Sequence, residues 1–218
     1  LYMSEKIMVP NLRFKCFDGE WEKKKIDNIL YENNTLINDD GDRLTVKLNL
    51  NGVFKRELKT IEKIGATRQY VRSEGDFIYG KQNIHKGCFG IIPKHLDNFV
   101  SSSDIPSFKF NKGFSNFFFY YKFSNFKFYD SLKYKMVGTS SKRYHVDIFL
   151  NTFLFFPSLE EQEKISHFFS KMDDLIDLNE RKLEILKKTK EYYLSVMFSK
   201  DGESVPQLRF KGFDGEWE

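Results

Sequence analysis

One stretch of the chain, residues 158–199, contains neither glycine nor proline. Because these two residues interrupt helices, their absence from a segment rich in Glu, Lys and Leu predicts a single long α-helix. Ser158 and Glu161 fit a capping box at its start, and Gly202 and Pro206 follow its end. At about 1.5 Å per residue, such a helix is roughly 63 Å long.

Apolar residues recur along this segment at steps of three and four, which is the spacing of a coiled-coil seam. Asn179 and Lys190 are polar residues in the same register. If Asn179 is buried in the seam, it fixes the register and the number of paired helices. The alternative is that Asn179 faces water. Because the helix is longer than a small domain is wide, we expect a second helix, from another chain or from a second repeat, to cover its apolar stripe. The expected pairing residues are Ile165, Phe169, Met172, Ile176, Asn179, Leu183, Leu186, Tyr193 and Met197.

The charge of the chain is unevenly distributed. Residues 1–157 contain 25 Lys and Arg against 17 Asp and Glu, whereas residues 158–199 contain 7 against 9. A basic first part joined to a slightly acidic segment predicts that only the first part meets a polyanion. The chain has no secretory signal and no run of about 18 apolar residues, so we expect a cytoplasmic protein that does not span a membrane.

Residues 17–157 show short apolar alternations broken by polar turns, which predicts a β-rich domain. Residues 45–50 and 53–58 alternate, and residues 76–79 and 88–92 flank a loop. One helix is expected around residues 21–30. The predicted fold class is therefore α+β, with a globular β-rich domain over residues 9–157 and the long coiled-coil-forming helix over residues 158–199.

The motifs of common catalytic sites are missing or incomplete. Gly75, Gly80 and Lys81 match the GxxxxGK pattern of a phosphate-binding loop, but Gln82 replaces the Ser or Thr that binds magnesium. A nucleotide-binding enzyme built on this near-motif remains a minor alternative. Cys16 and Cys88 form no CxxC pair, and the four histidines lack metal-ligand spacing. We expect no enzyme activity, metal or cofactor in this chain.

A binding surface is the alternative that remains. In GKQNIHKG, residues 80–87, two glycines bracket Lys, Gln, Asn and His side chains that can bind phosphates and the edges of bases. An ordinary solvent-exposed hairpin loop has the same composition and is the alternative. Residues 109–143 hold eight Lys or Arg against one acid. Most of the aromatic rings between them are expected in the core, with Lys112, Lys122, Lys127, Lys142 and Arg143 facing outward. The candidate DNA-binding residues are Lys81, Gln82, Asn83, Lys86, Ser102, Ser103, Lys112, Ser140, Ser141, Lys142 and Arg143.

One sequence occurs twice. VPNLRFKCFDGEWE at residues 9–22 and VPQLRFKGFDGEWE at residues 205–218 agree at twelve of fourteen positions, with an offset of 196 residues. Solenoid repeats recur every 20 to 50 residues or so, and a much longer period predicts duplication of a domain-sized unit. We expect residues 205–218 to be the start of a second, truncated repeat, and Leu1 and Tyr2 to lie outside the fold.

Three segments resemble the specificity (S) subunit of type I restriction-modification systems. They are VPNLRFKCFDGEWEKKKI at residues 9–26, GDFIYGKQNIHKGCFGIIPKHLDNFVSSSDIPSF at residues 75–108, and GTSSKR at residues 138–143 followed by FPSLEEQEKI at residues 156–165. The resemblance implies a target-recognition domain followed by a conserved helix, in tandem halves whose two helices run antiparallel as a spacer. It also implies that the chain reads one half of a split double-stranded DNA target and docks methyltransferase (M) and restriction (R) subunits.

The same resemblance implies that the chain is non-catalytic, and that the methyltransferase of the complex uses S-adenosylmethionine. The missing second half leads us to expect a half-subunit that pairs with itself through the 158–199 helix and reads a palindromic split site. The alternative is a coiled-coil scaffold whose basic domain binds nucleic acid without sequence preference.

Overall fold

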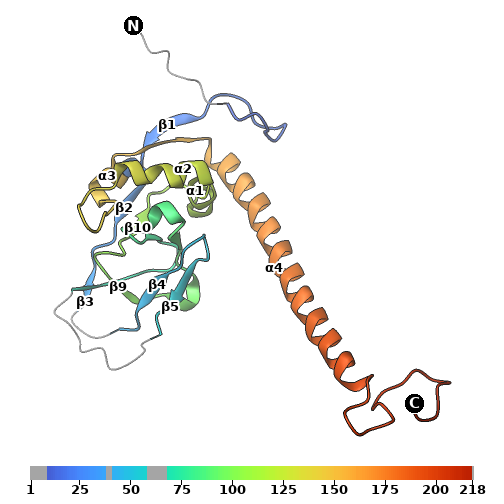
Figure 1. Cartoon of the computed structure of the whole chain (residues 1–218). Helices are drawn as coiled ribbons and strands as arrows, with labels where there is room; N and C mark the ends of the chain where they lie inside the picture. The colour runs from blue at the N-terminus through green and yellow to red at the C-terminus, as the bar shows by residue number, and fades with distance from the viewer. Residues whose placement is uncertain (1–8, 38–40, 58–67, 218) are drawn as a thin grey trace. The chain divides into compact units, whose positions relative to one another are not determined.

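The computed structural model describes residues 9–37, 41–57 and 68–217 (Figure 1). One compact unit comprises the chain up to His167, and a second begins at Phe168. Leu1, Tyr2, the Leu58 end of an expected strand and the final Glu218 lie outside the described residues.

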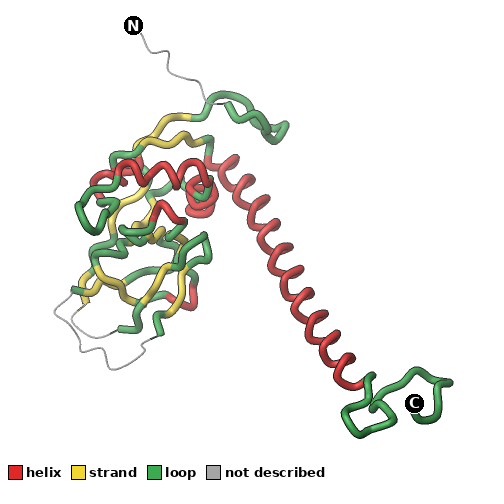
Figure 2. The backbone as a smooth tube through the Cα atoms, viewed as in Figure 1, coloured by secondary structure: helices red, strands yellow, loops and turns green. Residues whose placement is uncertain are grey.

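In the first unit, the largest sheet of the described residues has four antiparallel strands (Figure 2). Its order is β2 (Leu30–Glu32), β10 (Ser107–Phe110), β7 (Phe77–Tyr79) and β8 (Phe89–Ile91). Strands β7 and β8 pair directly, with Ile78 opposite Gly90. This pairing confirms the two strands that the sequence predicts around the loop at residues 80–87.

Three smaller antiparallel sheets complete the strand architecture of the described residues. One has the order β3 (Leu36–Ile37), β6 (Gln69–Val71) and β9 (Val100–Ser102). The hairpin of β4 (Leu44–Val46) and β5 (Val53–Lys55) confirms a strand in each of two further predicted segments. The first strand is shorter than expected, because residues 47–52 form the turn between them. In the last sheet β1 (Glu22–Lys25) pairs with β11 (Phe153–Phe156), so the strand that enters the domain lies beside the strand that leaves it.

Three short helices lie between β10 and β11. Ser115 caps α1 (Asn116–Phe123) by accepting a 3.2 Å bond from the Phe118 N–H, and Asn125 caps α2 (Phe126–Ser131) in the same way. The third is α3 (Val146–Leu150). Single 3-10 turns are η1 (Ile26–Asn28), η2 (Ile84–Lys86), η3 (Lys94–Leu96) and η4 (Leu132–Lys135).

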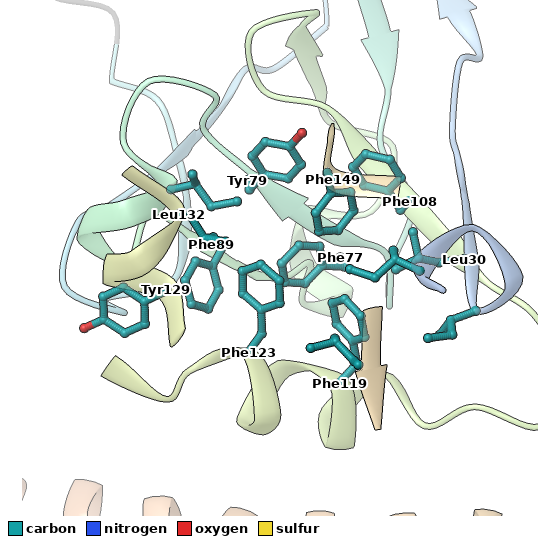
Figure 3. Close-up of a cluster of buried hydrophobic side chains, with 14 of the residues drawn as sticks. Leu30, Phe77, Tyr79, Phe89, Phe108, Phe119, Phe123, Tyr129, Leu132 and Phe149 are labelled. Atoms are coloured by element: carbon teal, nitrogen blue, oxygen red, sulfur yellow. The ribbon is translucent and has the colours of Figure 1, made fainter. Parts of the chain in front are cut away.

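Aromatic side chains form the main core, as the sequence predicts (Figure 3). The Phe77 ring lies 5.0 Å from Phe119 and 5.3 Å from Phe123, both edge-on, and it stacks on Phe149 at 5.7 Å. Because side chains alternate along a strand, Ile78 points to the opposite face of β7. There it packs into a second cluster with Leu44, Val46, Val53, Cys88, Ile92 and Leu96. The four-stranded sheet therefore has a buried cluster on each face.

The long helix is α4 (Leu159–Val196), which confirms the helix predicted from the glycine- and proline-free stretch. Ser158 Oγ accepts a 3.4 Å bond from the Glu161 N–H, which is one of the two bonds of a capping box. The expected pairing residues Phe169, Met172, Ile176, Asn179, Leu183, Leu186 and Tyr193 are exposed in the single chain, whereas Ile165 and Met197 are half-buried. No helix within residues 9–37, 41–57 and 68–217 combines the length and the apolar composition that a membrane span requires.

The helix expected around residues 21–30 is wrong. Residues 22–25 form β1, because their backbone groups pair with β11, and Ile26–Asn28 form only a single 3-10 turn before β2. The helices α1 and α2, which carry much of the aromatic core, were not expected. The α+β class with a long C-terminal helix is nevertheless confirmed.

Candidate nucleic-acid interface

The loop at residues 80–87 joins β7 to β8 and contains η2. The turn between β4 and β5 supports it, because the Asn49 and Leu50 N–H groups donate to the Lys86 and Gly87 carbonyls at 2.8 and 2.9 Å. Gly87 has a φ of +69°, and a Cβ there would lie 3.0 Å from the Leu50 nitrogen. Only glycine fits this position without strain. The loop is thus a fixed platform.

Lys81 connects this platform to two other loops that contain candidate residues. Its N–H donates to the Asp104 carbonyl at 2.9 Å, and its carbonyl accepts from the Tyr144 N–H at 2.8 Å. Arg143 Nε also donates to the Asp104 carboxylate, at 3.1 Å. We call the loops at residues 80–87, 102–105 and 137–144 the three-loop surface.

Ten of the eleven candidate residues lie on the three-loop surface. Gln82, Lys86, Ser103, Ser140 and Lys142 are exposed, and Lys81, Asn83, Ser102, Ser141 and Arg143 are half-buried. Among the described residues, Lys81, Lys86 and Lys142 form no ion pair with a carboxylate. Their positive charges are therefore available to an external anion.

Lys112 is the candidate that lies elsewhere. It lines a hollow of about 590 Å³ together with Arg13, Pro157 and Glu161, near the start of α4. Lys122, which was expected to face outward, is half-buried, and its Nζ lies 4.8 Å from the centre of the Trp21 ring. Burial lowers the pKa of Lys122 to about 8. The expectation for Lys122 is wrong because α1 places it beside Trp21.

Sequence reasoning missed two residues of η4 beside the platform, Tyr134 and Lys135. The turn η4 and helix α2 pack against η2, and η4 carries an exposed Tyr134 and an exposed Lys135. His85 on η2 is half-buried, and burial together with the neighbouring Lys86 lowers its pKa. The signal for η4 was present in the basic run at residues 109–143, but nothing in it singled out these two residues.

The buried Arg72 side chain supports the loop at residues 102–105 through hydrogen bonds. The side chain is 1 % exposed. Its guanidinium donates to the Ser102 and Ile105 carbonyls at 3.4 and 3.0 Å, and to Ser101 Oγ at 2.7 Å. Burial lowers the pKa of Arg72 to about 10. A single arginine in a short strand-rich segment gives no sequence signal for such a role.

The near-motif between Gly75 and Lys81 does not form a phosphate-binding loop. Phe77, Ile78 and Tyr79 are fully buried in β7, so the segment between the two glycines cannot wrap a phosphate. The Asp76 carboxylate is also buried, and it accepts bonds from Asn33 and Ser107. Within the described residues, no group of three or more His, Cys, Asp or Glu side chains is placed to hold a metal ion.

Comparison with solved structures gives a fold match over most of the chain. The HsdS subunit from Thermoanaerobacter tengcongensis is 18% identical with a TM-score of 0.55, over 85% of this chain and 51% of that one. The S subunit of a type I restriction-modification system from M. genitalium is 16% identical with a TM-score of 0.58, over 89% and 50%.

A third match is a chain from a study of complex assembly and conformational transition of the type I R-M system, at 12% identity and a TM-score of 0.50, over 87% and 47%. This chain thus spans about half the length of each structure. The likeness at such identities is one of fold alone.

A comparison with curated protein sequences found no match. The family model of the type I restriction modification DNA specificity domain matches residues 18–188, which is most of the chain and includes the three-loop surface and much of α4. The chain therefore belongs to the family of type I restriction-modification DNA specificity domains.

Proposed function

We propose that this chain is a DNA sequence-recognition subunit of a type I restriction-modification complex, and that it reads one half of a split target in double-stranded DNA. The observation that carries the proposal is the three-loop surface, where Lys81, Lys86 and Lys142 have no carboxylate partner among the described residues. Lysines of this kind bind the phosphate backbone and set the position of a domain on the duplex.

The side chains between these lysines suit base readout. Gln82 is exposed and Asn83 half-exposed on the rigid platform of residues 80–87. A side-chain amide can donate to N7 of adenine and accept from its N6 amino group, and both of these groups face the major groove. We therefore propose that the loop at residues 80–87 enters the major groove, and that the loop at residues 137–144 contacts the adjacent phosphate backbone of the DNA.

We further propose that α4 pairs with α4 of a second copy. Its apolar stripe is exposed in the single chain, and a large exposed apolar surface of this kind indicates a binding partner. The half at residues 159–177 has six acids against two bases, whereas the half at residues 178–196 has three acids against five bases. Antiparallel pairing places each acidic half beside a basic half, which favours that orientation. A two-fold pair of this kind reads a palindromic split site.

The remaining surface of the helical region is proposed to dock the methyltransferase and restriction subunits. On this proposal the chain is non-catalytic, with a recognition domain at residues 9–157, a spacer helix at residues 158–199 and the start of a second repeat at residue 205. The methyltransferase subunit supplies the chemistry with S-adenosylmethionine.

Selection from a pool of random duplexes with the full chain tests the proposal. We expect enrichment of one short sequence in two copies separated by a fixed number of unread base pairs, and tighter binding of that duplex than of a scrambled one. A selected pool that matches the starting pool, with equal affinity for both duplexes, would instead support a scaffold that binds nucleic acid without sequence preference.

A further inference from the structure

The repeated sequence is also a repeated structure. In the first copy the Phe17 N–H donates to the Phe14 carbonyl at 3.1 Å, and at the same offset the Phe213 N–H donates to the Phe210 carbonyl at 3.3 Å. A matching side-chain bond closes each turn: Arg13 Nη1 donates to the Gly19 carbonyl, and Arg209 Nη1 donates to the Gly215 carbonyl. We call residues 13–19 the first Arg turn and residues 209–215 the second Arg turn.

The first Arg turn binds the start of α4. Arg13 Nε and Nη2 donate to the two carboxylate oxygens of Glu161 at 2.7 and 2.6 Å, which is a two-pronged pairing. Glu161 is 1 % exposed, so this pairing is shielded from water. The Lys164 ammonium lies 6.0 Å from the centre of the Phe14 ring. The first Arg turn therefore binds the first turns of a helix through a Glu and a Lys that lie three residues apart.

The second Arg turn offers the same groups without a comparable partner. Within the described residues, Arg209 makes no ion pair, and its guanidinium lies 5.9 Å from the centre of the Trp217 ring. Phe210 and Phe213 are 72 % and 67 % exposed. They line an apolar hollow of about 540 Å³ with the last turns of α4.

The second Arg turn is attached at the end of α4. The Leu208 N–H donates to the Val196 carbonyl at 2.9 Å, and Trp217 packs edge-on against Phe198 at 6.2 Å. In an antiparallel pair of helices, the end of one helix lies beside the start of the other. The second Arg turn of one copy is thereby brought to the first turns of the partner's α4.

We propose that the second Arg turn binds the start of α4 of a second copy of this chain, with Arg209 paired to the exposed carboxylates of Glu160 and Glu163. This inference rests on the antiparallel pairing proposed above. Glu161 is already held by the Arg13 of its own chain, whereas Glu160 and Glu163 are exposed. The contact has charge complementarity, and the two-fold axis makes it occur twice in each dimer.

Exchange of the two charges tests the contact in the full chain. One variant is Arg209→Glu, and the other combines Glu160→Lys with Glu163→Lys. Each variant alone places like charges together at both ends, so we expect its dimer dissociation constant, from sedimentation equilibrium, to rise about tenfold or more. In a mixture of the two variants, opposite charges meet at both ends, and a heterodimer with near wild-type affinity should form. Lys94→Glu, an equal charge change on η3, should leave dimerisation unchanged.

Two results overturn the proposal in different ways. A wild-type chain that stays monomeric at every concentration refutes self-pairing of α4 and this contact together. A wild-type dimer with variants that dimerise normally, or with a mixture that does not recover affinity, refutes the Arg209 contact alone and leaves the antiparallel pairing intact. Circular dichroism of each variant shows whether α4 and the recognition domain are still folded.

Discussion

Arg72 and Asp76 are both buried, and two other residues connect them. Asp76 Oδ2 accepts bonds from Asn33 Nδ2 at 2.9 Å and from Ser107 Oγ at 3.0 Å. Arg72 Nη1 donates to the Asn33 carbonyl at 2.8 Å and to Ser107 Oγ at 3.3 Å. The positive and negative charges thus share one hydrogen-bond network, and this network supports the loop at residues 102–105.

Replacement of Arg72 by Met removes the positive member of this network. Asp76 then loses the guanidinium that shares its hydrogen-bond network and keeps only the more distant charge of Lys109, and the Ser102 and Ile105 carbonyls lose their donor. We expect the free energy of unfolding to fall by about 3 to 5 kcal/mol, as for other broken buried charge pairs. Urea unfolding of Arg72→Met measures this, with Arg68→Met on the exposed neighbour as the control. A loss below about 1 kcal/mol would show that the network contributes little.

The lowered pKa of Lys122 predicts that the free energy of unfolding depends on pH. Burial lowers its pKa from 10.5 to about 8 in the folded chain. Because the unfolded chain holds this proton more tightly, the contribution of Lys122 to stability rises with pH between about 8 and 10.5. At neutral pH the buried charge costs about 1 to 3 kcal/mol, an amount that its contact with Trp21 partly offsets.

The variant Lys122→Met tests this assignment. We expect it to be more stable than wild type at pH 7 by about 1 kcal/mol, and to lose that advantage by pH 10. Urea unfolding at the two pH values gives the comparison. An advantage of equal size at both values would mean that better apolar packing, and not the Lys122 proton, is the cause.

The three-loop surface predicts the salt dependence of DNA binding. Each lysine that contacts a phosphate adds roughly 0.9 to the slope of log affinity against log salt. We expect Lys86→Ala with Lys142→Ala to reduce that slope by about 2, whereas Lys112→Ala, which lies in the hollow near α4, leaves it unchanged. Fluorescence anisotropy at several salt concentrations measures the slopes. The assignment of the basic face is wrong if the double variant keeps the wild-type slope.

Asn179 predicts how tightly the helices pair. Its side-chain amide donates to the Leu175 carbonyl of its own helix at 2.7 Å. If it lies in the seam, burial of this polar group costs stability in exchange for a fixed register. We expect Asn179→Leu to lower the dimer dissociation constant and to allow species larger than a dimer. Sedimentation velocity detects both effects, and an unchanged distribution would place Asn179 on the water-facing side.

The sequence was most informative where local chemistry decides the structure. Ser158 and the absence of glycine and proline were enough to locate α4, and apolar alternation was enough to locate the β7–β8 and β4–β5 hairpins. The loop at residues 80–87 was recognised from its composition. Ten of the candidate residues meet on one surface because Lys81 binds the backbone of both other loops.

Contacts between distant segments decide the rest. Residues 22–25 have no strong preference of their own, and they become a strand because β11 lies beside them. Glu161 was expected to complete its own capping box, but Arg13, 148 residues earlier, takes its carboxylate. Arg72 and η4 acquire their roles only through packing, which a pattern along one chain does not reveal.

The pairing of β1 with β11 has a consequence for how such a protein changes its target. Glu22 lies opposite Phe156 and Lys25 opposite Phe153, so the chain leaves the recognition domain at the place where it entered. The residues between β1 and β11 therefore form an insert whose two ends are held together by one pair of strands. If the chain has the function proposed above, a different insert between β1 and β11 would change the DNA sequence that is read and leave α4 and its binding partners unchanged.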